Sequence, residues 1–529
     1  MYFPNLQPPF LLLNCVTVLS LPLIALLASM LSRREEIKLR ALLSGQLFAF
    51  ACAVFALAFY LVHPQDLSLA PIAGLLELKF DLLSLALALL ITFISSVVLS
   101  FSERYLVGDS RRTAFMQHLV LLTSFAAFLS ASDNLIFSLF CWHGISLILF
   151  RLVGLRKSGS DAQRTVLSHH ILSDAAFALS SCVIVAVCGT ANLTELSKHT
   201  ALLAGYELIP FLHASALTIA GLLLVVSMAV KSALFPFHRW LLATLEAPTP
   251  MSGLLHAGVV NVSAVAAARL WPVLSGSSEA LTFLGVLAAV SVVVGALVMS
   301  TQSDVKRKLV YSTVSQMGFM CLQCATGAIP AAVFHLIAHG LFKCHLFLQS
   351  GSAVNEGLMK RQWGQPAEAD WRKPQRLMVL VCLLSMVLPV CYSLLRAGSA
   401  ENGAVVSCII AAAAIGSSMP SFQRSGLFLI TVSSLAALFM LEFSGTVEHV
   451  LSVGMSSASR PDSELLFLSL FAFALLGTLL YVVRERGFGQ AIYVHALNGF
   501  YVDEIVGRFT SLMPGRLRAE KRRVKAGER

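Results

Sequence analysis

The stretch Lys231 to Asn261, KSALFPFHRWLLATLEAPTPMSGLLHAGVVN, decides how the rest of the chain is interpreted. Lys231 ends a run of roughly twenty mostly apolar residues, the length that an α-helix needs to cross a bilayer. A charged amine in such a segment costs a few kcal/mol to insert, so it is rare unless it is paired, hydrated or used. Pro236, Pro248 and Pro250 cannot continue a helix. The stretch therefore predicts a broken membrane helix that carries an ionisable group.

A second apolar segment carries three ionisable residues on one face. His335, His339 and Lys343 follow one another at intervals of four residues, and this spacing stacks side chains on one side of an α-helix. Amines and imidazoles that line up inside membrane helices are the groups that a proton path requires. We therefore predict that the chain conducts protons, with a second helix break near Lys343.

The composition places the whole chain in the membrane class. Hydrophobic residues make up 57% of the 529 residues and charged residues 12%, whereas soluble domains carry about 25% charged residues. Apolar segments of bilayer length recur along the chain; we count about fifteen, which predicts an all-α polytopic membrane protein. The expected spans are 10–32, 40–62, 73–101, 113–131, 134–153, 166–189, 211–232, 250–272, 280–300, 307–326, 330–353, 377–395, 403–418, 425–443 and 464–483.

Basic residues cluster in every second loop. Arg33, Arg111 and Lys306 belong to clusters that follow the first, third and ninth expected spans, and the alternate loops carry few basic residues. Because cytoplasmic loops hold such an excess, we expect a multi-pass membrane protein with its N-terminus outside and its C-terminus in the cytoplasm; that this membrane is the bacterial inner membrane is what the family resemblance given below implies. The net charge of +10 comes mostly from these loops and the tail. It gives no indication of a nucleic-acid partner.

The chain divides into two expected regions. Residues 1–486 form the transmembrane, proton-conducting region, and residues 487–529 form a cytoplasmic segment. Residues 491–512 could form an amphipathic helix on the membrane or on a partner. The last fourteen residues carry seven Lys or Arg against two Glu, a composition that suits anionic membrane lipids.

Several motifs in this order resemble one known family. Residues 80–84 read FDLLS and residues 304–309 read DVKRKL. Together with residues 231–269 and the helix of Lys343, they resemble the antiporter-like, proton-conducting membrane subunits of respiratory complex I (the NuoL type), Mrp antiporters and membrane hydrogenases. The resemblance covers at least residues 75–355. It implies the antiporter-like fold of that family.

Departures from the complex I pattern point to one branch of the family. Complex I subunits usually carry Trp-Glu-Gly in the fifth helix, whose glutamate pairs with the seventh-helix lysine, but here the triplet contains His143. No lysine occurs in 377–395, where a distal proton-exit lysine is expected. By contrast, HRWL at 238–241, LHAGVVN at 255–261 and NGFYVD at 498–503 resemble the DabB branch.

The DabB resemblance implies a division of labour with a second chain. DabB is the membrane subunit of a bacterial inorganic-carbon accumulation complex, and its partner DabA resembles a zinc-dependent β-carbonic anhydrase on the cytoplasmic side. The resemblance therefore implies that this chain is not itself an enzyme and holds no cofactor, and that zinc belongs to the partner. An ion gradient conducted here would energise hydration of CO2 to bicarbonate there.

Lys231 is the first candidate proton carrier. The alternative is a lysine that snorkels to the cytoplasmic interface, because it lies near that end of its span. Its carboxylate partner is open between Asp174 on the sixth span and, as a weaker candidate, Glu246. His143 could relay protons or could be a hydrogen-bonded packing residue.

The other candidates continue the path. His256 follows the proline break and could pass protons between Lys231 and the segment of Lys343. We expect Lys343 to be the second carrier and His335 and His339 to be its hydrated feeders. Four charged residues outside this path are candidates for structural ion pairs, and two histidines are expected to cap a helix or face water. These are Asp81, Arg151, Glu246 and Asp304, and His169 and His170.

The histidines do not form a metal motif. His335 and His339 have a compatible spacing of four residues, but they lack the HExxH pattern and no usual zinc ligand set is visible. We therefore predict no metal site in this chain.

Two other functions stay open. The chain could be a NuoL-like or Mrp-like subunit of a redox pump or cation/proton antiporter complex. It could also be a membrane scaffold that no longer conducts, which the histidine at 143 favours and the other intramembrane ionisable residues oppose. The coupling ion, a proton or sodium, is open as well.

Overall fold

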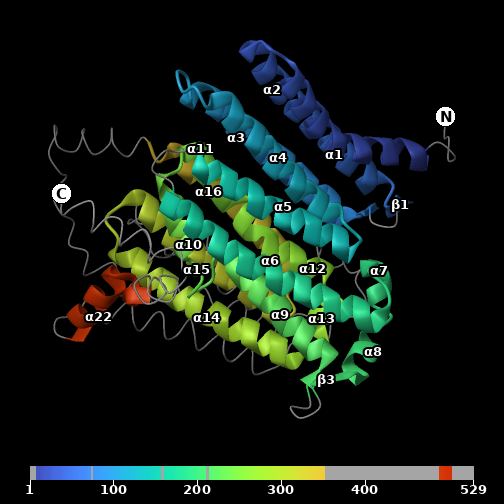
Figure 1. Ribbon diagram of the computed structural model, residues 1–529, viewed down its shortest axis with the longest axis vertical. Helices are drawn as coiled ribbons and strands as arrows, with labels where there is room; N and C mark the ends of the chain where they lie inside the picture. The colour runs from blue at the N-terminus through green and yellow to red at the C-terminus, as the bar shows by residue number, and fades with distance from the viewer. Residues whose placement is uncertain (1–6, 73–75, 156–159, 210–213, 352–487, 503–529) are drawn as a thin grey trace, which may run out of the picture.

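The computed structural model describes residues 7–72, 76–155, 160–209, 214–351 and 488–502. Within these ranges the chain is a bundle of long helices that run roughly parallel or antiparallel to one another (Figure 1). Helices α1 and α2 lie at one edge of the bundle, beside α3 and α4. The long helices are α1 (Gln7–Leu31), α2 (Glu35–Val62), α3 (Leu82–Tyr105), α4 (Arg112–Ala131), α5 (Leu135–Gly154), α6 (Ser160–Cys188), α9 (Ala216–Lys231), α14 (Ser278–Thr301), α15 (Val305–Ala325) and α16 (Ile329–Gln349).

Shorter elements connect these helices. In the described ranges, eight helices are long and apolar enough to cross a membrane, and the stretches Cys15–Leu31 and Ala216–Lys231 are apolar but shorter. The predicted membrane fold is therefore confirmed, and each of the first eleven expected spans overlaps one or more helices. The short elements are α7 (Leu193–Leu196), α8 (Thr200–Gly205), α10 (Arg239–Ala243), η2 (Thr244–Glu246), α11 (Thr249–Ala257), η3 (Val259–Asn261), α12 (Val262–Arg269), α13 (Trp271–Ser275), α22 (Phe488–Leu497) and η4 (Gly499–Tyr501).

Polar caps set where several helices begin. The Asp81 carboxylate accepts a hydrogen bond from the Ser84 amide, and the Ser84 hydroxyl accepts one from the Asp81 amide, so α3 begins with a capping box. Asn134 caps α5 and Asp304 caps α15 in the same way, through side-chain oxygens. These caps satisfy amide groups that lipid cannot.

The chain before α3 differs from the prediction. Residues 73–101 were expected to be one helical span, but Leu67–Ile72 (β1) and Leu76–Phe80 (β2) form an antiparallel hairpin and the helix begins at Leu82. Residues 76–80 alternate apolar and charged side chains, the pattern of a strand with one buried face. A second small sheet joins β3 (Glu207–Ile209) and β4 (Ala214–Ser215), so the fold is not purely helical.

The helix break after Lys231 occurs as predicted. Helix α9 ends at Lys231, Ala233 has a positive φ of 54°, and the Phe235–Pro236 peptide is cis. The chain turns there and resumes as α10 at Arg239. Pro248 is the N-cap of α11 and Pro250 lies in its first turn, where a missing amide leaves no hydrogen bond unmade.

The break predicted near Lys343 is wrong. Helix α16 is continuous from Ile329 to Gln349. The interruption lies instead in the neighbouring helix pair, where α11 stops and η3 intervenes before α12. Gly340 of α16 allows the two helices to approach closely, because a Cβ there would lie 2.8 Å from the Ala257 carbonyl oxygen.

The last four expected spans, 377–395, 403–418, 425–443 and 464–483, lie outside the described residues. The boundary predicted at residue 487 also stays a prediction. Of the C-terminal segment, α22 packs against α14, and Gln302 donates a hydrogen bond to the Leu497 carbonyl oxygen over 3.3 Å. This end of the chain therefore contacts the helical bundle.

Candidate functional site

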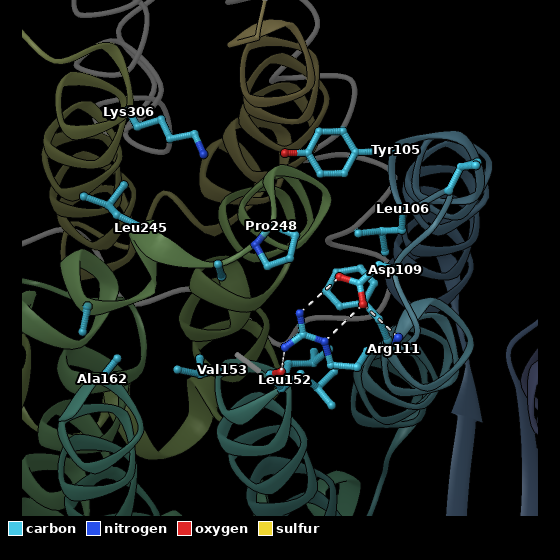
Figure 2. A pocket seen from close by; sticks show the side chains of 15 residues that line it. Tyr105, Leu106, Asp109, Arg111, Leu152, Val153, Ala162, Leu245, Pro248 and Lys306 are labelled. Carbon is cyan, nitrogen blue, oxygen red and sulfur yellow. Dashed lines mark hydrogen bonds and ion pairs between the residues drawn. The ribbon is translucent and has the colours of Figure 1, made fainter. Parts of the chain in front are cut away.

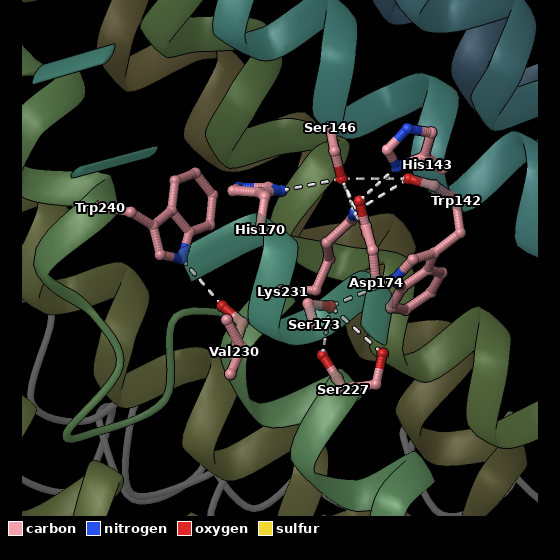
Figure 3. Close-up of polar contacts among 10 residues, drawn as sticks. All are labelled: Trp142, His143, Ser146, His170, Ser173, Asp174, Ser227, Val230, Lys231 and Trp240. Carbon is pink, nitrogen blue, oxygen red and sulfur yellow. Dashed lines mark hydrogen bonds and ion pairs between the residues drawn. The ribbon is translucent and has the colours of Figure 1, made fainter. Parts of the chain in front are cut away.

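Lys231 is fully buried, and its amine is held by three oxygen atoms. It donates hydrogen bonds to the Trp142 carbonyl oxygen at 2.9 Å, to the Ser146 hydroxyl at 2.5 Å and to the Asp174 carboxylate at 3.2 Å. The amine also lies 5.0 Å from the centre of the Trp142 ring, over which a cation is attracted. The side chain therefore does not snorkel toward water (Figure 3).

Three helices bring this cluster together. Trp142 and Ser146 belong to α5, Asp174 to α6 and Lys231 to the last turn of α9. Hydrogen bonds between small side chains fix these helices: the Trp142 indole donates to Ser173, and the Ser173 hydroxyl donates to the Ser227 carbonyl oxygen at 2.9 Å. The lysine is thus placed by residues that are distant in sequence.

Asp174 links Lys231 to His143. One carboxylate oxygen contacts the lysine amine, and the other lies 2.7 Å from Nδ1 of His143. The Ser146 hydroxyl also donates to this carboxylate at 2.9 Å. The His143 side chain is 52% exposed, whereas that of Asp174 is 11% exposed. Amine, carboxylate and imidazole therefore form a continuous polar chain from the interior to the outer face of α5.

His170 was expected at a helix end or in water, and that expectation is wrong. It is buried, and so is His169. Nδ1 of His170 lies 3.2 Å from the Ser146 hydroxyl, its Nε2 has no hydrogen-bond partner, and its ring meets the edge of Trp240. The signal that points to it is the spacing of four residues to Asp174, which places both on one face of α6.

Lys343 is also buried, but its surroundings differ. Its amine donates to the Ser312 hydroxyl at 2.7 Å and to the Leu309 carbonyl oxygen at 3.3 Å, both on α15. It forms no ion pair with any of the described residues. Among the described residues, only neutral oxygen atoms therefore stabilise a cation in this position.

Two histidines share the face of α16 that carries Lys343. His335 is held between Gln323 and Gln316, with 3.0 Å between each amide oxygen and one ring nitrogen. His339 is buried, and neither of its ring nitrogens has a hydrogen-bond partner among the residues that the structure describes. The two rings meet edge to face with their centres 6.0 Å apart. A buried imidazole without partners is costly unless it is used.

His256 joins this second cluster from α11. Its Nδ1 lies 2.9 Å from the Thr313 hydroxyl, and its ring stacks on Phe347 of α16 with the ring centres 4.1 Å apart. It is buried next to the interruption between α11 and α12. The structure thus groups His256 with the residues of α15 and α16.

Of the candidate ion-pair residues, Asp81 makes a bidentate ion pair. Both guanidinium nitrogens of Arg269 reach its carboxylate, at 2.6 and 2.9 Å, and Arg269 also donates to the Ser130 carbonyl oxygen. Burial acts to raise the pKa of Asp81, but the adjacent guanidinium outweighs it, so the pKa is lowered. Sequence reasoning missed Arg269.

The other candidate ion-pair residues are placed differently. Arg151 is exposed in the last turn of α5 and forms no ion pair within the described residues. Asp304 serves as the cap of α15 rather than as an ion-pair partner. The side chain of Glu246 lies outside what the structure describes, and in the described ranges no three His, Cys, Asp or Glu side chains are grouped to hold a metal ion.

Comparisons with known proteins agree with this architecture. A sequence profile described as "NADH:quinone oxidoreductase/Mrp antiporter, TM" matches residues 132–439, and one described as "NADH-Ubiquinone oxidoreductase (complex I), chain 5 N-terminus" matches residues 71–116. The structure is similar to a chain of the Mrp complex from Dietzia sp. DQ12-45-1b, with a TM-score of 0.54 and 21% identity over 98% of this chain and 59% of that one. That likeness concerns the fold.

Relatives by sequence include subunits of carbon transporters. "Probable inorganic carbon transporter subunit DabB2" of Halothiobacillus neapolitanus (strain ATCC 23641 / c2) is 30% identical over 492 residues, which cover 87% of this chain and 86% of that protein. "Probable inorganic carbon transporter subunit DabB1" of the same strain is 36% identical over 53% of this chain. That second match spans only 50% of the relative's own length.

The extent of these matches settles the family. The first profile covers more than half of the chain, and the DabB2 match extends over most of both proteins. The chain therefore belongs to the antiporter-like, proton-conducting membrane subunits of the NADH:quinone oxidoreductase/Mrp family and is homologous to the DabB subunits of inorganic carbon transporters.

Proposed function

We propose that this chain is the ion-conducting membrane subunit of an inorganic carbon transporter, and that the ion is the proton. It energises CO2 hydration and bicarbonate accumulation by a cytoplasmic, zinc-dependent partner of the DabA type, which resembles a β-carbonic anhydrase. The observation that carries the conduction half is the polar chain Lys231–Asp174–His143. The nearly full-length DabB2 match supports the carbon half.

The geometry supports proton transfer through the first cluster. A proton on His143 can pass to the carboxylate of Asp174 over 2.7 Å and from there reach the amine of Lys231 over 3.2 Å. Imidazole, carboxylate and amine can each hold a proton, so the chain needs no cofactor for this step. Lys343, which has no acidic partner among the described residues, is the second amine that can hold a proton.

The second cluster offers the continuation of the path. Imidazoles of His256, His335 and His339 lie on the same helices as Lys343 or directly against them. We place His335 and His339 as feeders of Lys343 and His256 as the link toward Lys231. In this proposal the start of α4, the start of α15 and the C-terminus lie on the cytoplasmic side and the N-terminus lies outside, and the excess of basic residues in alternate loops supports that orientation.

The energy released by protons that cross the membrane is large enough to drive CO2 hydration in one direction. Each proton that crosses about 100 mV releases about 2.3 kcal/mol. One or two protons per turnover would then make hydration effectively one-way, provided that they control access to the partner's active site. The chain supplies the gradient energy, and the partner supplies the zinc and the chemistry.

Carbon uptake tests the proposal. We would measure uptake of radiolabelled bicarbonate and CO2 in carbonic-anhydrase-deficient bacteria that express this chain with a DabA-type subunit, with and without a protonophore. Uptake that requires both chains and stops with the protonophore supports the proposal. Uptake that resists the protonophore indicates sodium coupling or a scaffold, and no uptake by an assembled complex contradicts it.

A cation/proton antiporter or redox-pump subunit is the second candidate. The match to the NADH:quinone oxidoreductase/Mrp profile and the structural similarity to the Mrp complex favour it. Sodium-dependent proton flux in proteoliposomes, without any need for a zinc subunit, would establish this function instead.

A further inference from the structure

A cleft of about 430 Å³ opens at the end of the bundle where the basic loops lie (Figure 2). It is bounded by the end of α3, the start of α4, the end of α5, the start of α6, the α10–η2 segment, the loop before α11 and the start of α15. None of the residues of the two proton-carrier clusters lines it. It is therefore a separate feature that the conduction path does not explain.

Polar groups enter the cleft from several sides. The Lys306 amine and the Tyr105 hydroxyl both point into it, from opposite sides in Figure 2. Lys306 forms no ion pair within the described part of the chain. Arg111, at another wall, is paired with Asp109 at 3.1 Å and also donates to the Leu155 carbonyl oxygen. The cleft thus holds two cations and one carboxylate, and the charge of Lys306 is left over.

The remainder of the lining is apolar. Leu152, Val153, Leu245 and Pro248 form much of the surface between the polar groups. A cleft of this volume has room for a few side chains, and its exposed surface, about half polar and half apolar, suits an amphipathic occupant. A bare hydrated ion would leave that apolar surface in contact with water.

The charge around the cleft selects an acidic occupant. Of the nearby charged residues, Glu103 already contacts Arg112 at 3.8 Å and Asp161 contacts Arg164 at 3.7 Å. Arg307 and Lys308 add further positive charge at the start of α15. A surface with such an excess attracts negatively charged partners and orients them.

We propose that this cleft binds an acidic side chain carried on a surface loop of the cytoplasmic partner subunit. The inference rests on the proposed function for the existence and the side of that partner. The carboxylate of the loop pairs with Lys306 and accepts a hydrogen bond from Tyr105, while flanking apolar side chains cover Leu245 and Pro248. The partner is thereby held where it touches the connection between the two proton-carrier clusters.

One wall of the cleft is formed by the chain segment that connects the two proton-carrier clusters. Ala247 and Pro248 line it, and they join η2 to α11. Helix α11 carries His256, and the same short connection leads back through α10 to the break after Lys231. The Tyr105 hydroxyl also lies 3.4 Å from Thr249 at the start of α11. An occupant of the cleft thus contacts the one segment that links Lys231 to His256.

Site-specific cross-linking tests the occupant directly. A photo-activatable amino acid replaces Leu245, inside the cleft, in the full chain co-expressed with its DabA-type partner, and Phe93, exposed on α3, serves as the control position. The expected product joins position 245 to a peptide of the partner that contains Asp or Glu. Cross-links from 245 to lipid alone, or none in a complex that assembles, overturn the proposal.

A charge reversal measures the contribution of Lys306. Lys306→Glu should weaken partner binding about tenfold, as expected for the loss of about 1.4 kcal/mol, while Arg307→Glu, on the exposed side of the same helix turn, alters only the general positive charge and should weaken binding less. Reversal of the cross-linked acid in the partner should restore binding to Lys306→Glu. Equal binding by both variants overturns the proposal.

The two proposals fail in different ways. If the wild-type complex accumulates carbon and Lys306→Glu neither loses the partner nor slows uptake, the cleft assignment is wrong and the function stands. If Lys306→Glu releases the partner but the wild-type complex never accumulates carbon, the cleft assignment stands and the proposed function is wrong. Normal amounts of Lys306→Gln in the membrane confirm that position 306 is not needed for folding.

Discussion

Two buried lysines in one bundle are stabilised in different ways. Lys231 is held by the Asp174 carboxylate, a hydroxyl and a carbonyl oxygen. Lys343 has the Ser312 hydroxyl and the Leu309 carbonyl oxygen, and no acid among the described residues. The comparison teaches that the described part of the chain neutralises one buried amine with an acid and holds the other with a hydroxyl and a carbonyl oxygen of α15. The two sites should therefore respond differently to the removal of an acid and of a hydroxyl group.

The largest expected effect comes from removing either amine. Lys231→Met and Lys343→Met should each lower gradient-driven carbon uptake by about a hundredfold or more, because a proton path fails when one carrier is missing. Uptake by the complex, at matched protein levels, measures the effect. The exposed Lys308→Met is the control. Near-normal uptake by both variants would remove these residues from the path.

Removing the acid beside Lys231 should destabilise the protein more than removing Lys343 itself. Asp174→Ala leaves Lys231 buried without its carboxylate, and breaking a buried pair costs about 3–5 kcal/mol. Lys343→Met should cost much less, because among the described residues no acid is left unpaired when this cation is removed. Thermal unfolding in detergent compares the two variants. Equal destabilisation would mean that Lys343 has an acidic partner after all.

The Asp81–Arg269 pair provides a structural reference for both sites. Asp81→Asn should lower the free energy of unfolding by about 2 kcal/mol, since it removes charged hydrogen bonds, yet it should leave most of the ion conduction intact. Because the folded-state pKa of Asp81 is lowered, the pair stabilises the fold above the pKa of Asp81 in the unfolded chain.

The stability that the Asp81–Arg269 pair contributes is lost as the pH falls through the folded-state pKa of Asp81. Asp81→Asn lacks this contribution, so its stability should not show the same loss over that acidic range. Unfolding measured against pH for both proteins checks this. Parallel curves across that range would contradict the assignment.

The smallest expected effects come from removing the serine hydroxyl group that contacts each lysine. Ser312→Ala removes the side-chain oxygen that contacts Lys343 within the described part of the chain, while Ser146→Ala leaves Lys231 with Asp174. A hydrogen bond to a charged group is worth about 1.5–3 kcal/mol, so proton flux should respond more to Ser312→Ala. Flux in proteoliposomes checks the order, and a larger effect of Ser146→Ala would reverse the comparison.

Much of the fold was predictable because lipid constrains sequence strongly. Span lengths follow from bilayer thickness, and Pro236 and Pro248 mark real interruptions. The errors lie where local signals compete. Residues 76–80 are apolar enough for a span but alternate like a strand. Helix α16 continues past Lys343 without a break, and Gly340 allows its close contact with α11.

The site was predictable as a set of residues but less so as a set of contacts. Buried ionisable side chains are costly in a membrane, so their presence in apolar segments identifies Lys231, His339 and Lys343 without any coordinates. Nothing in the sequence pairs Arg269 with Asp81, because 188 residues separate them. The burial of His170 was missed for a similar reason, since its neighbours Ser146 and Trp240 come from other helices.

By itself, the sequence determined that this is a helical membrane protein with ionisable residues inside its spans, because hydropathy and charge are local properties of the chain. Only the tertiary structure decided which acid faces Lys231, that Asp174 connects this lysine to the exposed His143, and that the described surroundings of Lys343 contain no acid. These facts depend on how α5, α6, α9, α15 and α16 pack. Helix packing is set by many weak side-chain contacts between distant segments, and no local pattern records their sum.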